Sequence, residues 1–287
     1  MDIAIHLGAH CTDEDRILKA LLADRDMLRA EGTEVPVPSK ARPALRKALR
    51  SDQGSLLPGG QSPLLADLVE GQPDRVVFSY EGHLGAYAKV LNGSEMYSDA
   101  DARVTGLRDL FPGHQCFFLM GIRNPATFIP ALFAASTIDT FGTFVAGHDL
   151  GAMRWSDVII RIRTACPDVP LVVWCNEDLP LIWPDILRTV SGIEVPMKAD
   201  GMILQEIMTP KGFNRLQAYL QENPAPNLET WRKVVSAFLG KYVDESKVDE
   251  EIVLPGWSQD VIAALTVEYE ADLANIQTMA DVTFLLP

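Results

Sequence analysis

The sequence predicts a single α/β domain with a central parallel sheet flanked by helices and a helical C-terminal cap. Several short runs are nearly continuous in apolar residues, as strands buried on both faces are. Helical patterns separate these runs, and that alternation favours βαβ units. After about residue 195 the strand signal stops and only helical patterns follow. We therefore expect an α/β core over residues 1–195 and a helical cap over 196–287 within the same domain.

The expected elements alternate along the chain in a regular order. The strands are Asp2–Leu7, Arg75–Tyr80, Gln115–Ile122 and Pro170–Trp174. The helices of the core are Asp13–Ala30, Ala41–Leu49, Pro63–Glu70, Ala100–Leu110, Pro125–Ser136, Trp155–Ala165 and Pro180–Val190. The cap is expected to consist of Gly201–Gln221, Leu228–Tyr242 and Trp257–Met279, with Asn227 and Ser258 as N-cap residues.

Composition and charge narrow the classes of partner. The 25 basic and 39 acidic residues give a formal net charge of −14. Nucleic acids and anionic membranes both bind preferentially to a basic protein surface, so neither is an expected partner. The opening residues MDIAIHLGAH have no basic n-region, and no apolar run reaches the ~18 residues of a membrane span. Four widely spaced cysteines indicate reduced thiols and a cytoplasmic protein.

Polar side chains follow all four predicted strands of the core. The strands run into Gly8-Ala9-His10-Cys11-Thr12, Ser79 with Glu81 and His83, Arg123-Asn124-Pro125, and Asn176-Glu177-Asp178. Ligands of open parallel sheets bind beyond the carboxyl ends of the strands. The sequence therefore predicts one converging site at this edge.

The same segments resemble those of bacterial sulfotransferases. IHLGAHCTDEDRILKALLADRDMLRAEG looks like the family's first strand, loop and helix, whose loop reads roughly His-Lys-Thr-Gly-Thr-Thr. FFLMGIRNPATFIPALF is similar to the second signature, a strand followed by Arg-(Asn/Asp)-Pro. VVFSYEGHLG, VVWCNEDLP and LTVEYEADLANI also resemble family segments, so the resemblance covers nearly the whole chain.

The resemblance implies a P-loop fold and a donor, 3′-phosphoadenosine 5′-phosphosulfate (PAPS). In the family, the first loop binds the 5′-phosphosulfate, which here implies His10, Cys11, Thr12 and Asp13. The Arg of the second signature, with a Ser one or two helical turns later, holds the 3′-phosphate, which implies Arg123. Glu81 is the expected general base toward a hydroxyl acceptor, and His83 could share that role.

The phosphate-binding loop departs from the family pattern in its charge. Cys11 stands where the family has the Lys that steadies the leaving phosphate, and Asp13, Glu14 and Asp15 follow Thr12. At ~4 Å and an effective dielectric near 20, each carboxylate repels a phosphate charge by roughly 4 kcal/mol. We expect no cation to offset them and expect Thr12-x-x-Asp15 to form a capping box. In addition, Ala131 occupies the position aligned with the Ser of the second signature.

Three functions remain open at this point. The first is a sulfotransferase-like enzyme with a degenerate donor site, transferring a sulfuryl group to a hydroxyl or amine of a small-molecule or glycan acceptor. The second is a non-catalytic binding or interaction protein on the same scaffold. The third is a metal- or thiol-dependent hydrolase using His10, Cys11 and Glu14. In that third case His6 and His10, which alternate onto one strand face, could also ligate a metal.

Overall fold

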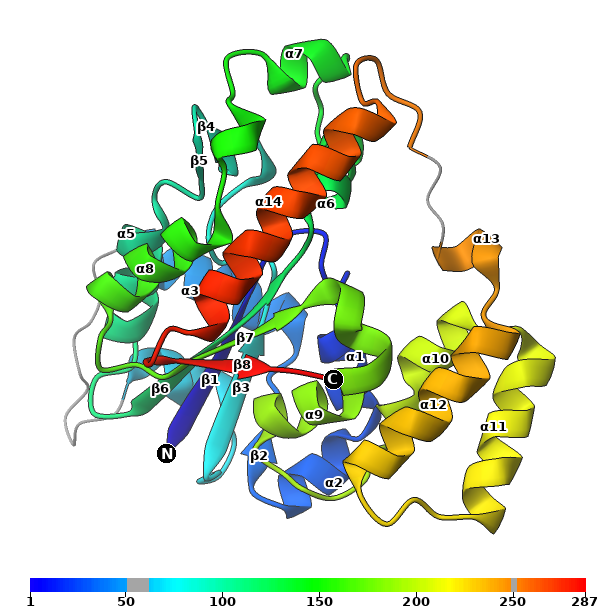
Figure 1. Cartoon of the computed structure of the whole chain (residues 1–287). Coiled ribbons are helices and arrows are strands. Elements are labelled where there is room, and N and C mark those ends of the chain that lie inside the picture. Colours follow the sequence, from blue (N-terminus) through cyan, green and yellow to red (C-terminus); the bar gives the residue numbers. More distant parts are fainter. Residues whose placement is uncertain (51–61, 249–251) are drawn as a thin grey trace.

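A six-stranded sheet lies at the centre of the computed structural model, which describes residues 1–50, 62–248 and 252–287 (Figure 1). Every neighbouring pair in the sheet is parallel, which confirms the predicted parallel α/β sheet. In spatial order the strands are β2 (Thr33–Glu34), β3 (Arg75–Ser79), β1 (Asp2–Gly8), β6 (Gln115–Ile122), β7 (Leu171–Cys175) and β8 (Val282–Leu285). A separate antiparallel pair joins β4 (Leu91–Asn92) to β5 (Glu95–Met96).

Helices cover both faces of the sheet, because the strands are apolar on both sides. One face packs against α1 (Arg16–Ala23) and α9 (Leu179–Ser191). The other packs against α5 (Ala100–Asp109), α6 (Pro125–Ala135), α8 (Trp155–Ala165) and α14 (Gln259–Gln277). The remaining helices of the core are α2 (Arg25–Ala30), α3 (Pro38–Arg50), α4 (Pro63–Leu68) and α7 (Phe141–Val145).

A pair of antiparallel helices stands to one side of the sheet, drawn in yellow in Figure 1. It consists of α11 (Pro210–Glu222) and α12 (Leu228–Tyr242), with α10 (Met202–Ile207) before it and α13 (Glu245–Val248) after it. The Thr209 and Asn227 side chains cap the two helices by accepting N–H groups of Gly212 and Thr230. The pair has a small core of its own around Leu204, Met208, Leu216 and Val235.

Three expectations about the elements are wrong. The last third is not purely helical, since β8 adds a strand next to β7. The helix expected over Asp13–Ala30 begins at Arg16 and is interrupted at Asp24. The helix expected over Gly201–Gln221 breaks at Met208 and Thr209, where Met208 forms an antiparallel bridge with Val243 and the Thr209 N–H donates to the Tyr242 carbonyl. By contrast, the N-caps expected at Asn227 and Ser258 are confirmed.

The topology places a crevice beyond the carboxyl end of β1. This strand pairs with β3 on one side and β6 on the other, so the chain reverses its direction of progress across the sheet there. Such a reversal point is where open α/β sheets bind ligands. Within the described ranges, no helix is both long and apolar enough to cross a membrane.

Candidate functional site

A cavity of about 620 Å³ opens at the carboxyl ends of β1, β6 and β7. Its walls include residues predicted from three of the four strand ends. The cavity therefore confirms the expected convergence for three strands, whereas the polar residues after β3 do not line it. The lining comprises Cys11, Thr12, Glu14, Arg16, Arg123, Thr127, Asn176, Glu177, Leu179, Pro180, Ile203, Glu206, Ile207 and Val248.

The loop after β1 is folded tightly against the segment that follows β3. Gly8 has a φ of +104°, and a Cβ added there would lie 2.8 Å from the Glu81 carbonyl oxygen. Only glycine accommodates both that conformation and that approach. Farther along the loop, Cys11, Glu14 and Asp15 adopt left-handed backbone conformations. The loop thus brings its amides around the Glu81 side chain.

The Glu81 carboxyl occupies the amides of this loop. The backbone N–H groups of Cys11 and Thr12 donate to it, while its Oε2 atom is buried without a hydrogen-bond partner. Burial, reinforced by the nearby Asp13 charge, raises the pKa of Glu81 to about 7, although the two amides pull it down. The sequence predicts Glu81 as a general base beside the loop, and the structure places its carboxyl against the loop amides themselves.

The Asp13 carboxylate accepts a hydrogen bond from a backbone N–H group in the first turn of α1. Its Oδ2 atom accepts the N–H of Ile17 at 3.1 Å, and the side chain is buried. The expected capping box is wrong, because the Thr12 hydroxyl donates to the Ala9 carbonyl at 2.6 Å instead. Asp15, which immediately precedes the helix, is left-handed and makes no side-chain cap. An internal carboxylate therefore satisfies an amide that would otherwise attract a bound anion.

Arginines offset the acidic loop, contrary to the expectation that no cation does. Arg42 on α3 forms an ion pair with Asp15 and also donates to its Oδ2 atom at 3.2 Å. Arg16 lies 3.5 Å from Glu14 and donates to Glu206 at 2.8 Å. The pairing of Arg42 with the loop could not be predicted from the loop sequence, because Arg42 lies on the separate helix α3. Both arginines are engaged with carboxylates.

Arg123 lies in the cavity wall and organises its surroundings. Its Nε donates to the Thr127 hydroxyl at 2.9 Å, and its Nη1 donates to the Cys11 carbonyl at 2.9 Å. Thr127 was not among the predicted site residues. Its position four residues after Arg123, one helical turn later, could have identified it as a neighbour of the arginine. Thr127, and not Ala131, supplies a hydroxyl beside this arginine. The cavity wall thus contains an arginine hydrogen-bonded to a hydroxyl on the first turn of α6.

The histidines of the region are buried and neutral. His83 is 6% exposed, and its Nε2 atom is buried without a hydrogen-bond partner. Burial, with the nearby His6 and Arg42, lowers its pKa to about 3. His10 lies 2.8 Å from the Tyr97 hydroxyl, and burial lowers its pKa to about 4. His6 is paired with Ser79 at 2.9 Å.

Cys11 is a poor nucleophile in this setting. Burial and the nearby Glu81 raise the pKa of its thiol to about 11, which Arg123 offsets only in part. Reactive cysteines require a lowered pKa. In addition, the described residues contain no group of three or more His, Cys, Asp or Glu side chains that could hold a metal ion. The hydrolase reading therefore has no support in the geometry of His10, Cys11 and Glu14.

Glu177, at the end of β7, ties the cavity to the C-terminal helix. Its two carboxylate oxygens accept the Asn124 backbone N–H at 2.7 Å and the Tyr269 hydroxyl at 3.0 Å. Asn124 in turn donates to the Thr266 hydroxyl at 3.0 Å. Through these bonds α14 fixes the ends of both β6 and β7, which explains how the terminal segment contributes to the site.

Comparison with known proteins identifies no relative. No family model matches the chain. Neither the curated proteins nor the solved structures contain a match. Any functional conclusion therefore rests on the residues of the site.

Proposed function

We propose that this chain is a non-catalytic binding protein on a sulfotransferase-like P-loop scaffold, and that it does not bind PAPS. The single observation that carries the proposal is the Glu81 carboxyl against the Cys11 and Thr12 amides. In the family that the sequence resembles, these amides would hold the donor's 5′-phosphosulfate. An internal carboxyl competes for the same donors and, when ionised, repels the same charge.

The charges of the cavity support this proposal. Two cations, Arg16 and Arg123, line it together with three acidic residues. Arg16 is already engaged with Glu206, and Asp13 fills the helix start. Cys11 stands where the family has the lysine that stabilises the charge developing as a sulfuryl group leaves its phosphate. A polyanionic nucleotide would therefore meet a wall with an acidic excess.

Calorimetry with 3′-phosphoadenosine 5′-phosphate, the desulfonated donor product, tests the proposal. We expect no binding heat for the wild-type protein at millimolar nucleotide. Removing the internal carboxyl with Glu81→Ala should raise the affinity at least about tenfold, which corresponds to ~1.4 kcal/mol of relieved repulsion. Glu270→Ala, at an exposed position on α14, is the matched control and should change nothing.

Two results would count against the proposal in different ways. Micromolar binding by the wild type that Arg123→Ala abolishes would refute the non-catalytic assignment. No binding by either the wild type or Glu81→Ala would leave the protein non-catalytic but would show that Glu81 is not what excludes the donor.

One observation favours an active sulfotransferase as a second candidate. Burial raises the pKa of Glu81 to about 7, the range that suits a general base, and the cavity keeps the Arg123–Thr127 pair. In that case Glu81 would accept the proton of a hydroxyl or amine on a small-molecule or glycan acceptor. Release of 3′-phosphoadenosine 5′-phosphate from PAPS in the presence of an acceptor, abolished by Glu81→Gln, would establish this candidate and overturn the first.

A further inference from the structure

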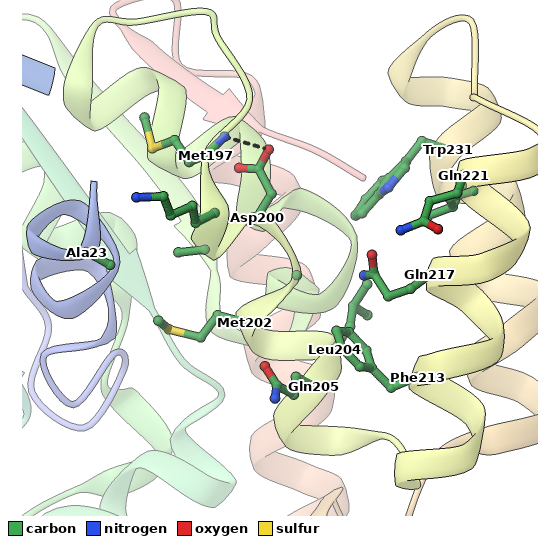
Figure 2. A pocket seen from close by; sticks show the side chains of 14 residues that line it. Ala23, Met197, Asp200, Met202, Leu204, Gln205, Phe213, Gln217, Gln221 and Trp231 are labelled. Carbon is green, nitrogen blue, oxygen red and sulfur yellow. Dashed lines mark hydrogen bonds between the residues drawn. The ribbon is translucent and has the colours of Figure 1, made fainter. Parts of the chain in front are cut away.

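A second cavity, of about 660 Å³, lies between the sheet layer and the helix pair α11–α12 (Figure 2). One wall is formed by the segment Met197–Met202 with part of α10, and the other by α11 and α12. Figure 2 shows Trp231, Gln217 and Gln221 projecting from the helix pair toward Met197 and Asp200. Its volume lies within the roughly 300–1,000 Å³ of small-molecule sites. Helices α1 and α10 contribute residues to both cavities, but no side chain lines both.

The charged residues of this wall are already neutralised. Lys198 lies 3.5 Å from Asp24, and Asp200 Oδ2 accepts from Arg188 at 3.2 Å and from the Met197 backbone N–H at 3.2 Å. The other carboxylate oxygen, Asp200 Oδ1, is buried without a hydrogen-bond partner and can accept from a donor on a ligand. A charged ligand would lose its hydration here without gaining a free counter-charge from these residues. The cavity therefore favours an uncharged ligand.

Besides Asp200, the polar side chains of the cavity include the amides of Gln217, which is half-buried, and of Gln205 and Gln221, which are exposed. Among the residues that the structure describes, Gln205, Gln217 and Gln221 make no side-chain hydrogen bond, although all three line the cavity. A glutamine amide offers two donor hydrogens and an acceptor oxygen, so it suits groups that donate and accept side by side. The half-buried indole of Trp231 adds a flat apolar surface, and Phe213 lies at the closed end beside Gly201.

We propose that this cavity binds an uncharged ring compound with a flat apolar face and paired donor and acceptor groups along its edge. The ring would stack on Trp231, and its edge would pair with Gln217 and Gln221. Neutral saccharides and free nucleosides share this chemistry, and the experiment distinguishes them. The proposal is independent of the donor site at β1, because the two cavities have no lining residue in common.

Tryptophan fluorescence provides a direct readout. Trp155, Trp174, Trp183 and Trp257 are buried, and Trp231 is the half-buried fifth tryptophan. Quenching by acrylamide therefore reports mainly on Trp231. Titration with maltotriose and with adenosine, in separate arms, should reduce this quenching in a saturable way for one of the two probes. Maltotrionic acid and adenosine monophosphate, the charged counterparts of the two probes, should bind at least about tenfold more weakly.

Two variants test the role of the amide. Gln217→Leu should weaken binding of the positive probe by about ten- to a hundredfold, because the ligand's polar edge is left unpaired. Gln277→Leu makes the same change at an exposed position on α14 and should leave binding unchanged. Protection by neither probe, equal binding of the charged analogues, or equal losses in the two variants would each overturn the proposal. Thermal unfolding of both variants verifies that they are folded.

Discussion

Glu81 is the residue whose environment departs most from that of a free carboxyl. Its folded pKa of about 7 lies above the ordinary value of 4.5, so the folded state retains a proton that the unfolded state has released between these pH values. The stabilisation is complete below about pH 4.5 and is lost as the pH rises through 7. At ~1.4 kcal/mol per pKa unit, the loss approaches roughly 3 kcal/mol. Glu81→Gln should abolish this dependence and should be more stable than wild type at about pH 8.

Urea unfolding of both proteins across this pH range checks the prediction. The difference between the two curves isolates Glu81 from His10 and His83, whose lowered pKa values act in the opposite direction by making stability rise with pH. Glu270→Gln, on the exposed surface of α14, serves as the control and should follow the wild type. Parallel curves for wild type and Glu81→Gln would show that the buried carboxyl is not protonated near neutrality.

Cys11 gives a second test at the scale of one side chain. It is the half-buried cysteine, while the other three are buried. With a pKa of about 11 instead of 9, the thiol should contain about a hundredfold less thiolate at about pH 8 than an unperturbed one. Alkylation by iodoacetamide, followed by mass spectrometry of the peptide with Cys11, should be correspondingly slow and should accelerate up to about pH 10. Alkylation as fast as that of glutathione would contradict the burial described for this thiol.

Much of this residue-scale detail lies beyond what the sequence can predict. The loop composition alone revealed the acidic residues. It could not reveal that Glu81, some 70 positions later, reaches the Cys11 and Thr12 amides, or that Arg42 pairs with Asp15. Such contacts depend on how β1 and β3 align in the sheet. Thr127 was different, because its spacing from Arg123 was visible in the sequence.

The elements of the core were predictable where burial leaves a clear pattern. The strands β1, β3, β6 and β7 are apolar on both faces and were located within a residue or two. The strand β8 was missed because its four residues are only partly buried, and β2 because it spans two residues. The break between α10 and α11 had a local signal, because Thr209 and Pro210 are an N-cap residue and an N1 proline. The bridge of Met208 to Val243 fixes the break by a tertiary contact.

Close packing between α11 and α12 depends on a single glycine. A Cβ at Gly212 would lie 2.2 Å from the Tyr242 Cβ atom, so Gly212→Ala should destabilise the helix pair by about 1–3 kcal/mol or more. Gly240, on α12, has no atom within 4 Å of its hypothetical Cβ. Gly240→Ala should therefore stabilise the protein by roughly 0.5–1 kcal/mol through its higher helix propensity. Urea denaturation of the two variants measures the contrast, and equal effects would exclude the close approach.

Across the whole molecule, buried apolar side chains are distributed unequally between the sheet layer and the helix pair α11–α12. Two extensive clusters cover the faces of the sheet, whereas the helix pair has a small cluster of four buried residues. The second cavity separates part of this pair from the sheet layer. Local opening free energies follow the amount of buried apolar contact. The helix pair is therefore the part of the molecule best placed to open while the sheet stays folded.

Hydrogen exchange measured by mass spectrometry tests this division. Peptides from α11 and α12 should exchange with an opening free energy clearly below that of peptides from β1, β6 and β7. Gly212→Ala should lower the opening free energy of the helix pair and leave that of the sheet nearly unchanged. Saturation with a ligand that binds between the helix pair and the sheet should raise protection in α11 and α12 selectively, because it links the two walls. If the helix pair and the sheet exchange with one common free energy in both proteins, the molecule unfolds as a single unit and the cavity does not mark a boundary of stability.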